Sequence, residues 1–562
     1  MVKLLLSLYG LYGPRRYIPA VFSLVRKRLF FRHLYQLTLN AADQAFHTLS
    51  NTSGLSDLYS GDPAQDALRI QNGARKLLSY QAGDETADFD IKMRWEANRG
   101  HHLPVLAMAG QLYDLPDKQV FEKTNAMEVA IAAINVVEAD KILSVQKTDE
   151  LKAFFKNSLL YIFSHSEKGA FFSTNHYFFN VLGALWIIEN IERDQHLQQV
   201  KEQLYSELYG LLEQLFNTDG SLYEGSTYYH KYVTDSLLLF MALNPIDQHI
   251  RKKILPFLTR MYAFCCYASC GQTLCGLGDN DSGRILPLPD YFDYSCTDMR
   301  LTHQLARLLT IKLPQEQQLK RLRELNSSGE ECAFGLIVLR NARWSVFVRC
   351  EQSAKPNLRL DVGSHCHNDQ MSLTVFHMDI PILIDIGVYS YVEHDLCRLY
   401  NLKTAAHNTI VVGRLEQDQI SNDWHYTPRR TMVKILNTGE YAVTGEYRAV
   451  DDYRHKRSVR LEEAMIKIDD EICYEGAETP IRLLFYLAPD IKAHVCKDRT
   501  VHIDAGQRSF MMEIEGTNSL CVEEAVCFPE YGMKVPCLKV VGYLQLKNNH
   551  CQISTTIRVC NS

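Results

Sequence analysis

The stretch that decides the fold lies past the middle of the chain and reads Phe334-Gly-Leu-Ile-Val-Leu-Arg340, Asn341-Ala-Arg343 and Trp344-Ser-Val-Phe-Val-Arg349. Two short runs rich in β-branched and aromatic residues flank a polar turn, which is typical of a β-hairpin. Similar runs follow at Met432–Leu436, at Tyr441–Thr444 and at Tyr543–Lys547, which precedes Asn548 and Asn549. Repeated short strands separated by turn signals predict an antiparallel β-sandwich.

Upstream of this hairpin the apolar residues follow a helical period. Leucines recur at helical spacing from Leu204 to Leu215 and stop at Asn217-Thr-Asp-Gly220. The character changes near Asn326-Ser-Ser-Gly-Glu330. The sequence therefore predicts an α+β multidomain chain: a basic N-terminal helical segment over residues 1–40, an all-α domain over 41–328 and an antiparallel sandwich over 329–562.

Size and composition indicate a globular protein of more than one domain. The 562 residues exceed what one hydrophobic core usually supports, and 46% are hydrophobic and 22% charged. The net charge of −6 argues against nucleic acid as a partner, although a basic cleft for a polyanionic substrate stays compatible with it. The 16 cysteines form no CxxC pair, which favours buried thiols in a reducing compartment.

The N-terminus supports two interpretations. Met1–Gly10 resembles the start of a signal peptide, but Gly, Pro and Arg residues interrupt it and no cleavage site follows, so cytoplasm and cell envelope both stay open. No stretch reaches the roughly 18 apolar residues that a transmembrane helix needs. Seven Arg or Lys and no acidic residue precede Ala41, which predicts either a peripheral membrane or polyanion contact or a solvated helical face. No feature indicates an oligomeric state.

Histidines gather at the start of the predicted sandwich, in Gly363-Ser-His-Cys-His-Asn-Asp369. On an extended segment, His365 and His367 leave the same face. Asp385 and His407 lie downstream, and two imidazoles with a carboxylate suit a borderline metal such as zinc. The alternative is a set of surface or core histidines that bind no metal.

Three segments of the helical half carry more polar groups than a plain helical array needs. They are Asn175-His176, Asp219-Gly-Ser-Leu-Tyr-Glu-Gly-Ser-Thr-Tyr-Tyr-His230 and Gly278-Asp-Asn-Asp-Ser-Gly-Arg284. Taken singly, each has a structural explanation as a helix cap, as amphipathic packing or as a turn.

Taken in order, these segments resemble the heparinase II/III family over about residues 90–420. The motifs that carry the resemblance are Trp95-Glu-Ala-Asn-Arg99, Asn175-His176, Asp219-Gly with Glu224-Gly-Ser and Tyr229-His230, His365-Cys-His-Asn-Asp369, Asp385-Ile-Gly-Val-Tyr389 and Ala406-His-Asn-Thr409. The resemblance implies an incomplete (α/α) toroid followed by an antiparallel β-sandwich. It also implies a polysaccharide lyase whose substrate is an acidic, uronate-containing glycan.

The resemblance further implies residue roles. Asn175 and His365 would neutralise the uronate carboxylate, and His176 would be the base for one C5 configuration. Tyr229 would protonate the leaving oxygen and serve as base for the other configuration, with Tyr228 as the alternative if the helix register differs. Glu224 and His230 would support these groups, and the metal ligands would be His367, Asp385 and His407, with zinc in a structural role.

A tyrosine base would need help, because a free tyrosine has a pKa of about 10. The sequence offers Arg94, Arg99 and Arg284 as cations that would lower this pKa. Three competing functions stay open: a uronyl C5-epimerase on the same scaffold, a non-catalytic glycan-binding or assembly protein, and a glycoside hydrolase. The hydrolase would need a carboxylate pair drawn from Glu224, Asp279 and Asp281.

Overall fold

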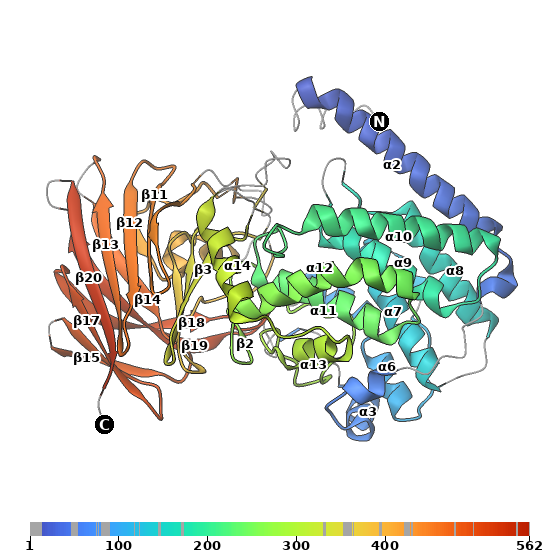
Figure 1. Cartoon of the computed structure of the whole chain (residues 1–562). Helices are drawn as coiled ribbons and strands as arrows, with labels where there is room; N and C mark the ends of the chain where they lie inside the picture. The colour runs from blue at the N-terminus through green and yellow to red at the C-terminus, as the bar shows by residue number, and fades with distance from the viewer. Residues whose placement is uncertain are drawn as a thin grey trace.

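The structure, a computed structural model, describes most of the chain. The described residues are 14–46, 54–74, 76, 78–79, 90–116, 118–122, 124–143, 148–169, 173–329, 333–351, 362–363, 365–392, 396–420, 427–428, 431–476, 479–497, 499–546 and 549–560. A helical domain and a sheet domain lie side by side, with the N-terminal helix α2 crossing the outside of the helical domain (Figure 1).

The helical domain is built from helices in chain order. Their bounds are α2 Pro14–Asn40, α3 Pro63–Gln71, α5 Ile91–Asn98, α6 His102–Met108, α7 Ala126–Leu143, α8 Asp149–Ser164, α9 Asn175–Asn190, α10 Gln195–Leu215, α11 Thr227–Leu243, α12 Gln248–Tyr267, α13 Arg300–Leu308 and α14 Glu316–Ser328, with short 3-10 turns at Asp43–Phe46, Gly54–Leu58 and Lys118–Phe121.

Burial divides these helices into an inner and an outer set. Nearly every residue of α7, α9 and α11 is buried, whereas α8, α10 and α12 bury one face and expose the other. Helices that are apolar all round belong inside a helical array, and amphipathic ones belong outside it. Asp194 starts α10 by accepting hydrogen bonds from the backbone N–H groups of His196 and Leu197.

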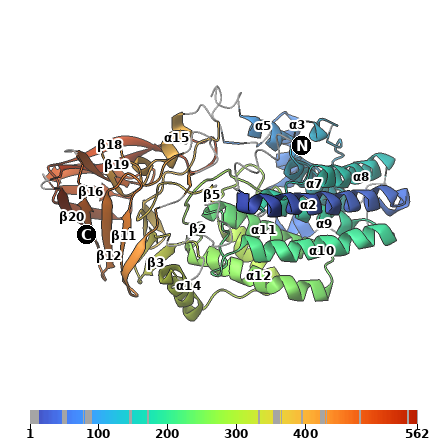
Figure 2. The same cartoon turned by 90° about the horizontal axis from the view of Figure 1, so that it is seen from above.

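The N-terminal helix packs on the body through its C-terminal half. Phe31, Leu34 and Leu37 are buried, and α2 lies against α8 and α10, as the view from above also shows (Figure 2). Arg26, Arg28 and Arg32 remain exposed. The signal-like Met1–Gly10 run lies outside the described residues. Among the described helices, none combines the length and the apolar character needed to cross a bilayer.

The sheet domain is antiparallel. Its strands are β3 Leu336–Arg340, β4 Trp344–Arg349, β5 Val362–Gly363, β6 Leu373–His377, β7 Ile380–Leu383, β8 Ile410–Val412, β9 Thr427–Pro428, β10 Lys434–Thr438, β11 Ala442–Arg448, β12 Arg454–Leu461, β13 Met465–Cys473, β14 Pro480–Tyr486, β15 Lys492–Lys497, β16 Thr500–Asp504, β17 Ser509–Glu515, β18 Ser519–Cys527, β19 Val535–Gln545 and β20 His550–Val559, with the short helix α15 Leu396–Leu402 and a 3-10 turn at Thr404–Ala406 in between.

Three sheets share one core. The eight-stranded sheet runs β10-β11-β12-β13-β20-β17-β16-β15, and the four-stranded sheets run β18-β19-β14-β8 and β3-β4-β6-β7. Burial alternates along β12 and β13, so one face of the large sheet is covered. Its inward residues and those of both small sheets form a single hydrophobic cluster. The predicted fold class, an incomplete (α/α) toroid followed by an antiparallel β-sandwich, is confirmed.

Three details differ from the sequence-based expectations. The helical half contains a small hairpin, β1 Ser269–Cys270 with β2 Thr273–Leu274, although no strand was expected there. The runs on either side of Asn548 and Asn549 do not pair, because β19 and β20 belong to different sheets. Residues 365–369 form a loop rather than a strand, since a turn replaces ladder pairing there.

Two buried polar side chains fix the start of the sheet domain. Asn326 Oδ1 accepts hydrogen bonds from the backbone N–H groups of Gly335 and Leu336 at 2.8 and 2.9 Å. Asp219 Oδ2 accepts from Phe334 N at 2.9 Å and from Asn326 Nδ2 at 2.9 Å. Asp219 therefore joins the two domains.

Candidate functional site

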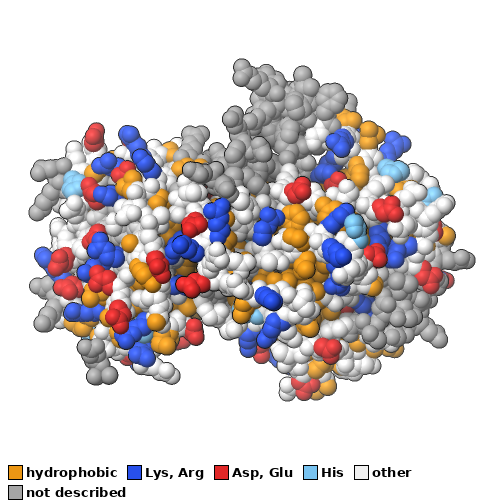
Figure 3. Space-filling model, viewed as in Figure 1, with side chains coloured by type: hydrophobic (Ala, Val, Ile, Leu, Met, Phe, Trp, Pro, Cys, Tyr) orange, Lys and Arg blue, Asp and Glu red, His pale blue; other side chains and the backbone are white. Residues whose placement is uncertain are grey.

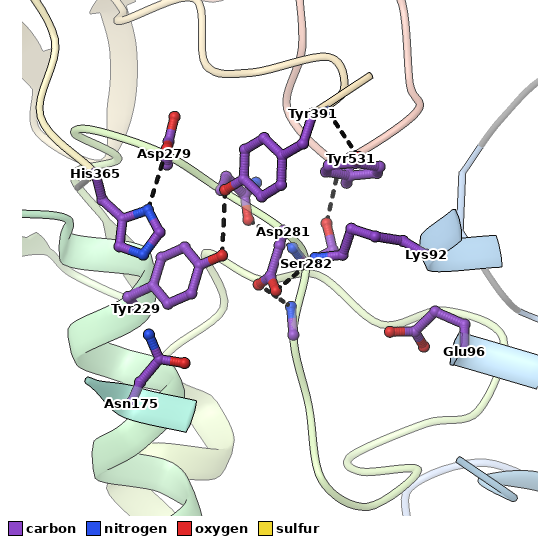
Figure 4. A network of polar contacts seen from close by, with 12 residues as sticks. Lys92, Glu96, Asn175, Tyr229, Asp279, Asp281, Ser282, His365, Tyr391 and Tyr531 are labelled. Carbon is purple, nitrogen blue, oxygen red and sulfur yellow. Dashed lines mark hydrogen bonds and ion pairs between the residues drawn. The ribbon is translucent and has the colours of Figure 1, made fainter. Parts of the chain in front are cut away.

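Residues from both domains converge where the first residues of α9 and α11 meet the loop after β5. Figure 4 shows Tyr229 between Asn175 and His365, with Asp279 on the far side of His365. Glycine makes this approach possible, because a Cβ on Gly225 would lie 2.1 Å from Cys366 Sγ and one on Gly278 would lie 2.5 Å from the carbonyl oxygen of His365. Both glycines have positive φ.

Ser226 sets the position of the tyrosine. Its Oγ caps α11 by accepting a hydrogen bond from Tyr229 N at 3.2 Å, and it donates to the carbonyl oxygen of Asp279 at 2.6 Å. Asp279 N in turn donates to the carbonyl oxygen of His365 at 3.0 Å. One serine thus ties the start of the helix to the polar loop that contacts the sheet domain.

Glu224 joins Asn175 and His365. Its Oε1 accepts from Asn175 N at 2.7 Å, its Oε2 accepts from Asn175 Nδ2 at 2.6 Å, and Oε2 lies 3.4 Å from His365 Nε2. Burial alone would raise the pKa of this carboxyl, but the contacts with His365 and Asn175 lower it. Glu224 is therefore an anion that orients two of the predicted site residues.

His365 lies between two carboxylates. Its Nδ1 is 3.1 Å from Asp279 Oδ2, opposite the contact with Glu224. Burial would lower the pKa of His365, but hydrogen bonds and charges from Asp279 and Glu224 raise it to about 9. At neutral pH the imidazole is a cation, held in place from both sides.

Tyr229 stacks on this imidazolium, with ring centroids 3.9 Å apart and planes 10° from parallel. Its hydroxyl lies 3.2 Å from the hydroxyl of Tyr391. Burial and the charge of Asp281 raise the pKa of Tyr229 well above its ordinary value, so the phenol keeps its proton. Tyr228 points elsewhere, since a Cβ on Gly276 would lie 1.9 Å from its hydroxyl oxygen.

None of the three arginines proposed from the sequence brings the pKa of Tyr229 below its ordinary value. Arg99 forms buried ion pairs with Glu96 and Glu128. Arg284 donates to the carbonyl oxygens of Asp290 and Tyr291. Arg94 is exposed on α5. This expectation is wrong, because burial and carboxylates dominate around Tyr229.

His176 lies at the edge of the cluster, and 41% of its side chain is exposed. Its Nδ1 is 2.7 Å from Glu167 Oε1. Burial would lower the pKa of His176, but the hydrogen bond and the charge of Glu167 raise it. The structure therefore brings Asn175, Tyr229 and His365 together and leaves His176 beside them. His230 faces the core, where it contacts Leu222 N and Met261 O.

Asp279 is the centre of the polar network, a role that the sequence did not predict, because it offered Asp279 only as a turn residue or as one carboxylate of a hydrolase pair. Its carboxylate contacts His365, lies 2.9 Å from His367 Nε2, and accepts from Arg398 Nη1 at 2.5 Å and from Nη2 at 3.2 Å. Burial would raise the pKa of Asp279, but Arg398 and the two histidines hold it well below its ordinary value. The polar run Gly278–Arg284 marks Asp279 in the sequence, whereas Arg398, on α15, belongs to none of the motifs recognised in the sequence.

The three predicted metal ligands also converge. Donor atoms of His367, Asp385 and His407 all lie within 4.8 Å of one another. His407 Nδ1 is 2.6 Å from Asp385 Oδ2, and its buried Nε2 has no hydrogen-bond partner in the described part of the chain. Two imidazoles and a carboxylate could hold a metal ion, and Asp279 contacts His367 as a carboxylate that could orient this ligand.

The sheet domain matches a known family of domains. Residues 329–556 match the family described as heparinase II/III-like, C-terminal, which confirms the predicted resemblance. No curated protein matches the chain by sequence.

Solved structures extend the likeness over both domains. A crystal structure of heparinase III matches with a TM-score of 0.62 at 14% identity, over 95% of this chain and 85% of that one. Another heparinase III matches with a TM-score of 0.58 at 15% identity, over 91% and 86%. Heparan sulfate lyase HepC from Pedobacter heparinus matches with a TM-score of 0.53 at 15% identity, over 86% and 78%. At these identities the comparison shows a shared fold.

Proposed function

We propose that this chain is a polysaccharide lyase that cleaves a uronate-containing glycan by β-elimination. One observation carries the proposal. The protonated phenol of Tyr229 stacks on the cationic imidazole of His365, with ring centroids 3.9 Å apart, beside the amide of Asn175. The structures that resemble the chain over both domains are named heparinase III and heparan sulfate lyase, which supports an acidic glycan as substrate.

The reaction needs a group that accepts developing negative charge. Removing the C5 proton of a uronate moves charge onto its carboxylate, and preorganised donors lower the free energy of that state. His365 supplies a positive charge, and Asn175 Nδ2 has one proton left after donating to Glu224. Glu224 and Asp279 hold these donors in place, so no rearrangement is needed when charge develops.

Proton transfer is divided between two side chains. Tyr229 holds its proton and donates it to the O4 oxygen as the glycosidic bond breaks. His176 takes the C5 proton in its neutral form, and Glu167 sets how much of that form is present. The electron pair of the C5–H bond becomes the C4–C5 double bond, and the departing sugar leaves as an alcohol.

The site is less suited to glycoside hydrolysis. That reaction needs a carboxylic acid that stays protonated. Glu224 contacts His365, Asp279 contacts Arg398, and Asp281 contacts Lys92 at 2.7 Å. These contacts lower the pKa of all three carboxyls although burial acts in the other direction. A C5-epimerase would share the proton abstraction and differs in its product.

We propose in addition one structural zinc ion per chain, held by His367, Asp385 and His407. When bound, zinc would fix the two loops that carry these histidines, next to the catalytic residues. Elemental analysis of chelator-free protein should find one zinc per chain, and chelation should lower the melting temperature of the wild type. His407→Ala should lower the melting temperature and remove its response to chelator. Protein without stoichiometric metal would refute the site.

The lyase proposal is tested by the products formed from a panel of uronate glycans. A lyase produces unsaturated uronides, whose conjugated C4–C5 double bond absorbs at short ultraviolet wavelengths, without taking up water. Saturated fragments heavier by one water would indicate hydrolysis, and an uncleaved glycan with altered uronate configuration would indicate epimerisation. An unchanged glycan across the panel would favour the binding or assembly function.

A further inference from the structure

A cavity lies at the domain junction, and none of the residues assigned to catalysis lines it. It has a volume of about 1160 Å³ and is lined by α13, by the segment that leads to α14, and by the turns of the β1–β2, β3–β4 and β6–β7 hairpins. This exceeds the roughly 300 to 1,000 Å³ of a typical small-ligand site. The cavity therefore has room for several sugar units.

The lining is strongly cationic. Arg300, Arg307, Lys312, Arg340 and Arg343 line it, against one carboxylate, that of Asp379. The lining is therefore positively charged, although the chain as a whole has a net charge of −6. Basic side chains gather on the face drawn in Figure 3 where α13 lies beside the β1–β2 hairpin.

Three of these cations are available to a ligand. Arg307, Lys312 and Arg343 are exposed, and none forms an ion pair with a carboxylate in the described ranges. The other two have structural partners: Arg300 pairs with Asp298 at 2.6 Å, and Arg340 donates to the carbonyl oxygen of Tyr267 at 2.9 Å.

Contacts between the domains fix the shape of this cavity. Cys270 Sγ in the helical domain lies 2.9 Å from the carbonyl oxygen of Met378 in the sheet domain. A Cβ on Gly271 would lie 2.6 Å from Asp379 Oδ1, so the two hairpin turns are in close contact. Arg340 spans the same junction. The walls are therefore held from both sides without a ligand.

Apolar groups lie among the cations. Leu313 and Met378 are 65% and 53% exposed, so the lining also offers apolar surface to a ligand. Tyr262 also lines the cavity, and its hydroxyl lies 2.8 Å from His303 Nδ1. Pyranose rings carry apolar C–H faces together with their polar groups, and acidic sugars add carboxylate or sulfate groups at regular intervals.

We infer that this cavity is an accessory binding site for an acidic oligosaccharide segment, in which Arg307, Lys312 and Arg343 contact its anionic groups. The identity of the ligand rests on the proposed function, whereas the cavity and its charges do not. The site would hold a polymer chain at a second place, away from Tyr229 and His365. Nucleic acid fits less well, because the lining lacks a row of exposed aromatic rings for base stacking.

The test replaces the three available cations together, Arg307→Gln, Lys312→Gln and Arg343→Gln, in the full chain. A matched control removes the same charge from exposed residues elsewhere, Lys252→Gln, Lys492→Gln and Arg558→Gln. Binding of heparan sulfate and alginate oligosaccharides is measured by calorimetry at low salt, with a neutral oligosaccharide and a DNA oligonucleotide of equal charge as further probes. Cleavage of a long polymer is measured in parallel.

The cavity variant should bind at least one acidic oligosaccharide about tenfold or more weakly than the control variant, because three ionic contacts are lost at low ionic strength. It should lose no DNA affinity beyond that of the control. Equal oligosaccharide affinities of the two variants would overturn the inference, and so would an equal loss for DNA. If the cavity variant loses binding while wild type cleaves nothing, the accessory site stands and the lyase proposal falls.

Discussion

Tyr229 and His365 form a stacked pair in which both rings hold a proton at neutral pH, for opposite reasons. Burial and a nearby carboxylate keep the phenol neutral, whereas Glu224 and Asp279 keep the imidazole charged. This division suits an acid beside a charge neutraliser. The sequence predicted both residues from ordered motifs, but it did not predict their protonation, which depends on carboxylates from two different segments, Glu224 in one and Asp279 and Asp281 in the other.

The proposed base gives a pH prediction at the same scale. Because Glu167 raises the pKa of His176, kcat/KM should rise with pH through a value above the ordinary histidine pKa of about 6.5. Above pH 9 the rate should fall as His365 loses its charge. Glu167→Gln removes the raising charge, so the rising limb should move to lower pH.

The matched control for that profile is Glu207→Gln. Glu207 contacts Lys168 and Tyr177 rather than His176, so its replacement should leave the rising limb where it is. A Glu167→Gln profile that coincides with that of the wild type would show that His176 is not the base.

At the scale of elements, the candidate site is built from the first turns of helices rather than from their apolar faces. The leucine period predicted α10 well, because the apolar spacing of an amphipathic helix depends only on residues that are close together in the sequence. The loop at residues 365–369 and the short helix α15 were not predictable in the same way, because contacts with the helical domain determine their positions. Asn175 and Tyr229 both reach the site because they lie in the first turn of their helices.

The helix cap of α11, Ser226, should affect both stability and turnover. Ser226→Ala should cost about 1 kcal/mol of stability, as lost helix caps do, and should also lower turnover, because the same hydroxyl holds Tyr229 N and Asp279 O. Thr148→Ala removes the cap of α8 and should cost a similar free energy without loss of turnover. Equal turnover in the two variants, measured beside urea unfolding, would contradict the positioning role of Ser226.

At the scale of the molecule, one buried carboxylate joins the domains at the site. Asp279 belongs to the helical domain, and its partners His365, His367 and Arg398 belong to the sheet domain. The sequence predicted the two-domain architecture because helical and strand periods differ. It could not predict this junction, because Asp279 and Arg398 are 119 residues apart.

Removing that carboxylate should destabilise the molecule strongly. Asp279→Asn leaves Arg398 buried without a full counter-charge, which typically costs about 3–5 kcal/mol. Asp452→Asn breaks an exposed pair with Arg448 and should cost no more than about 1 kcal/mol. Denaturant unfolding measures both, and similar small losses would contradict the junction role of Asp279.

The central claim, that Tyr229 is the proton donor of a β-elimination, is tested most directly by the rate at which unsaturated uronide forms with Tyr229→Phe and with Tyr228→Phe. Each variant loses only one hydroxyl. A positioned acid contributes about 10² to 10⁴ in rate, so Tyr229→Phe should lose at least a hundredfold in turnover with its melting temperature nearly unchanged, whereas Tyr228→Phe should keep most of the turnover. Wild-type turnover in Tyr229→Phe, or a loss confined to Tyr228→Phe, would contradict the assignment.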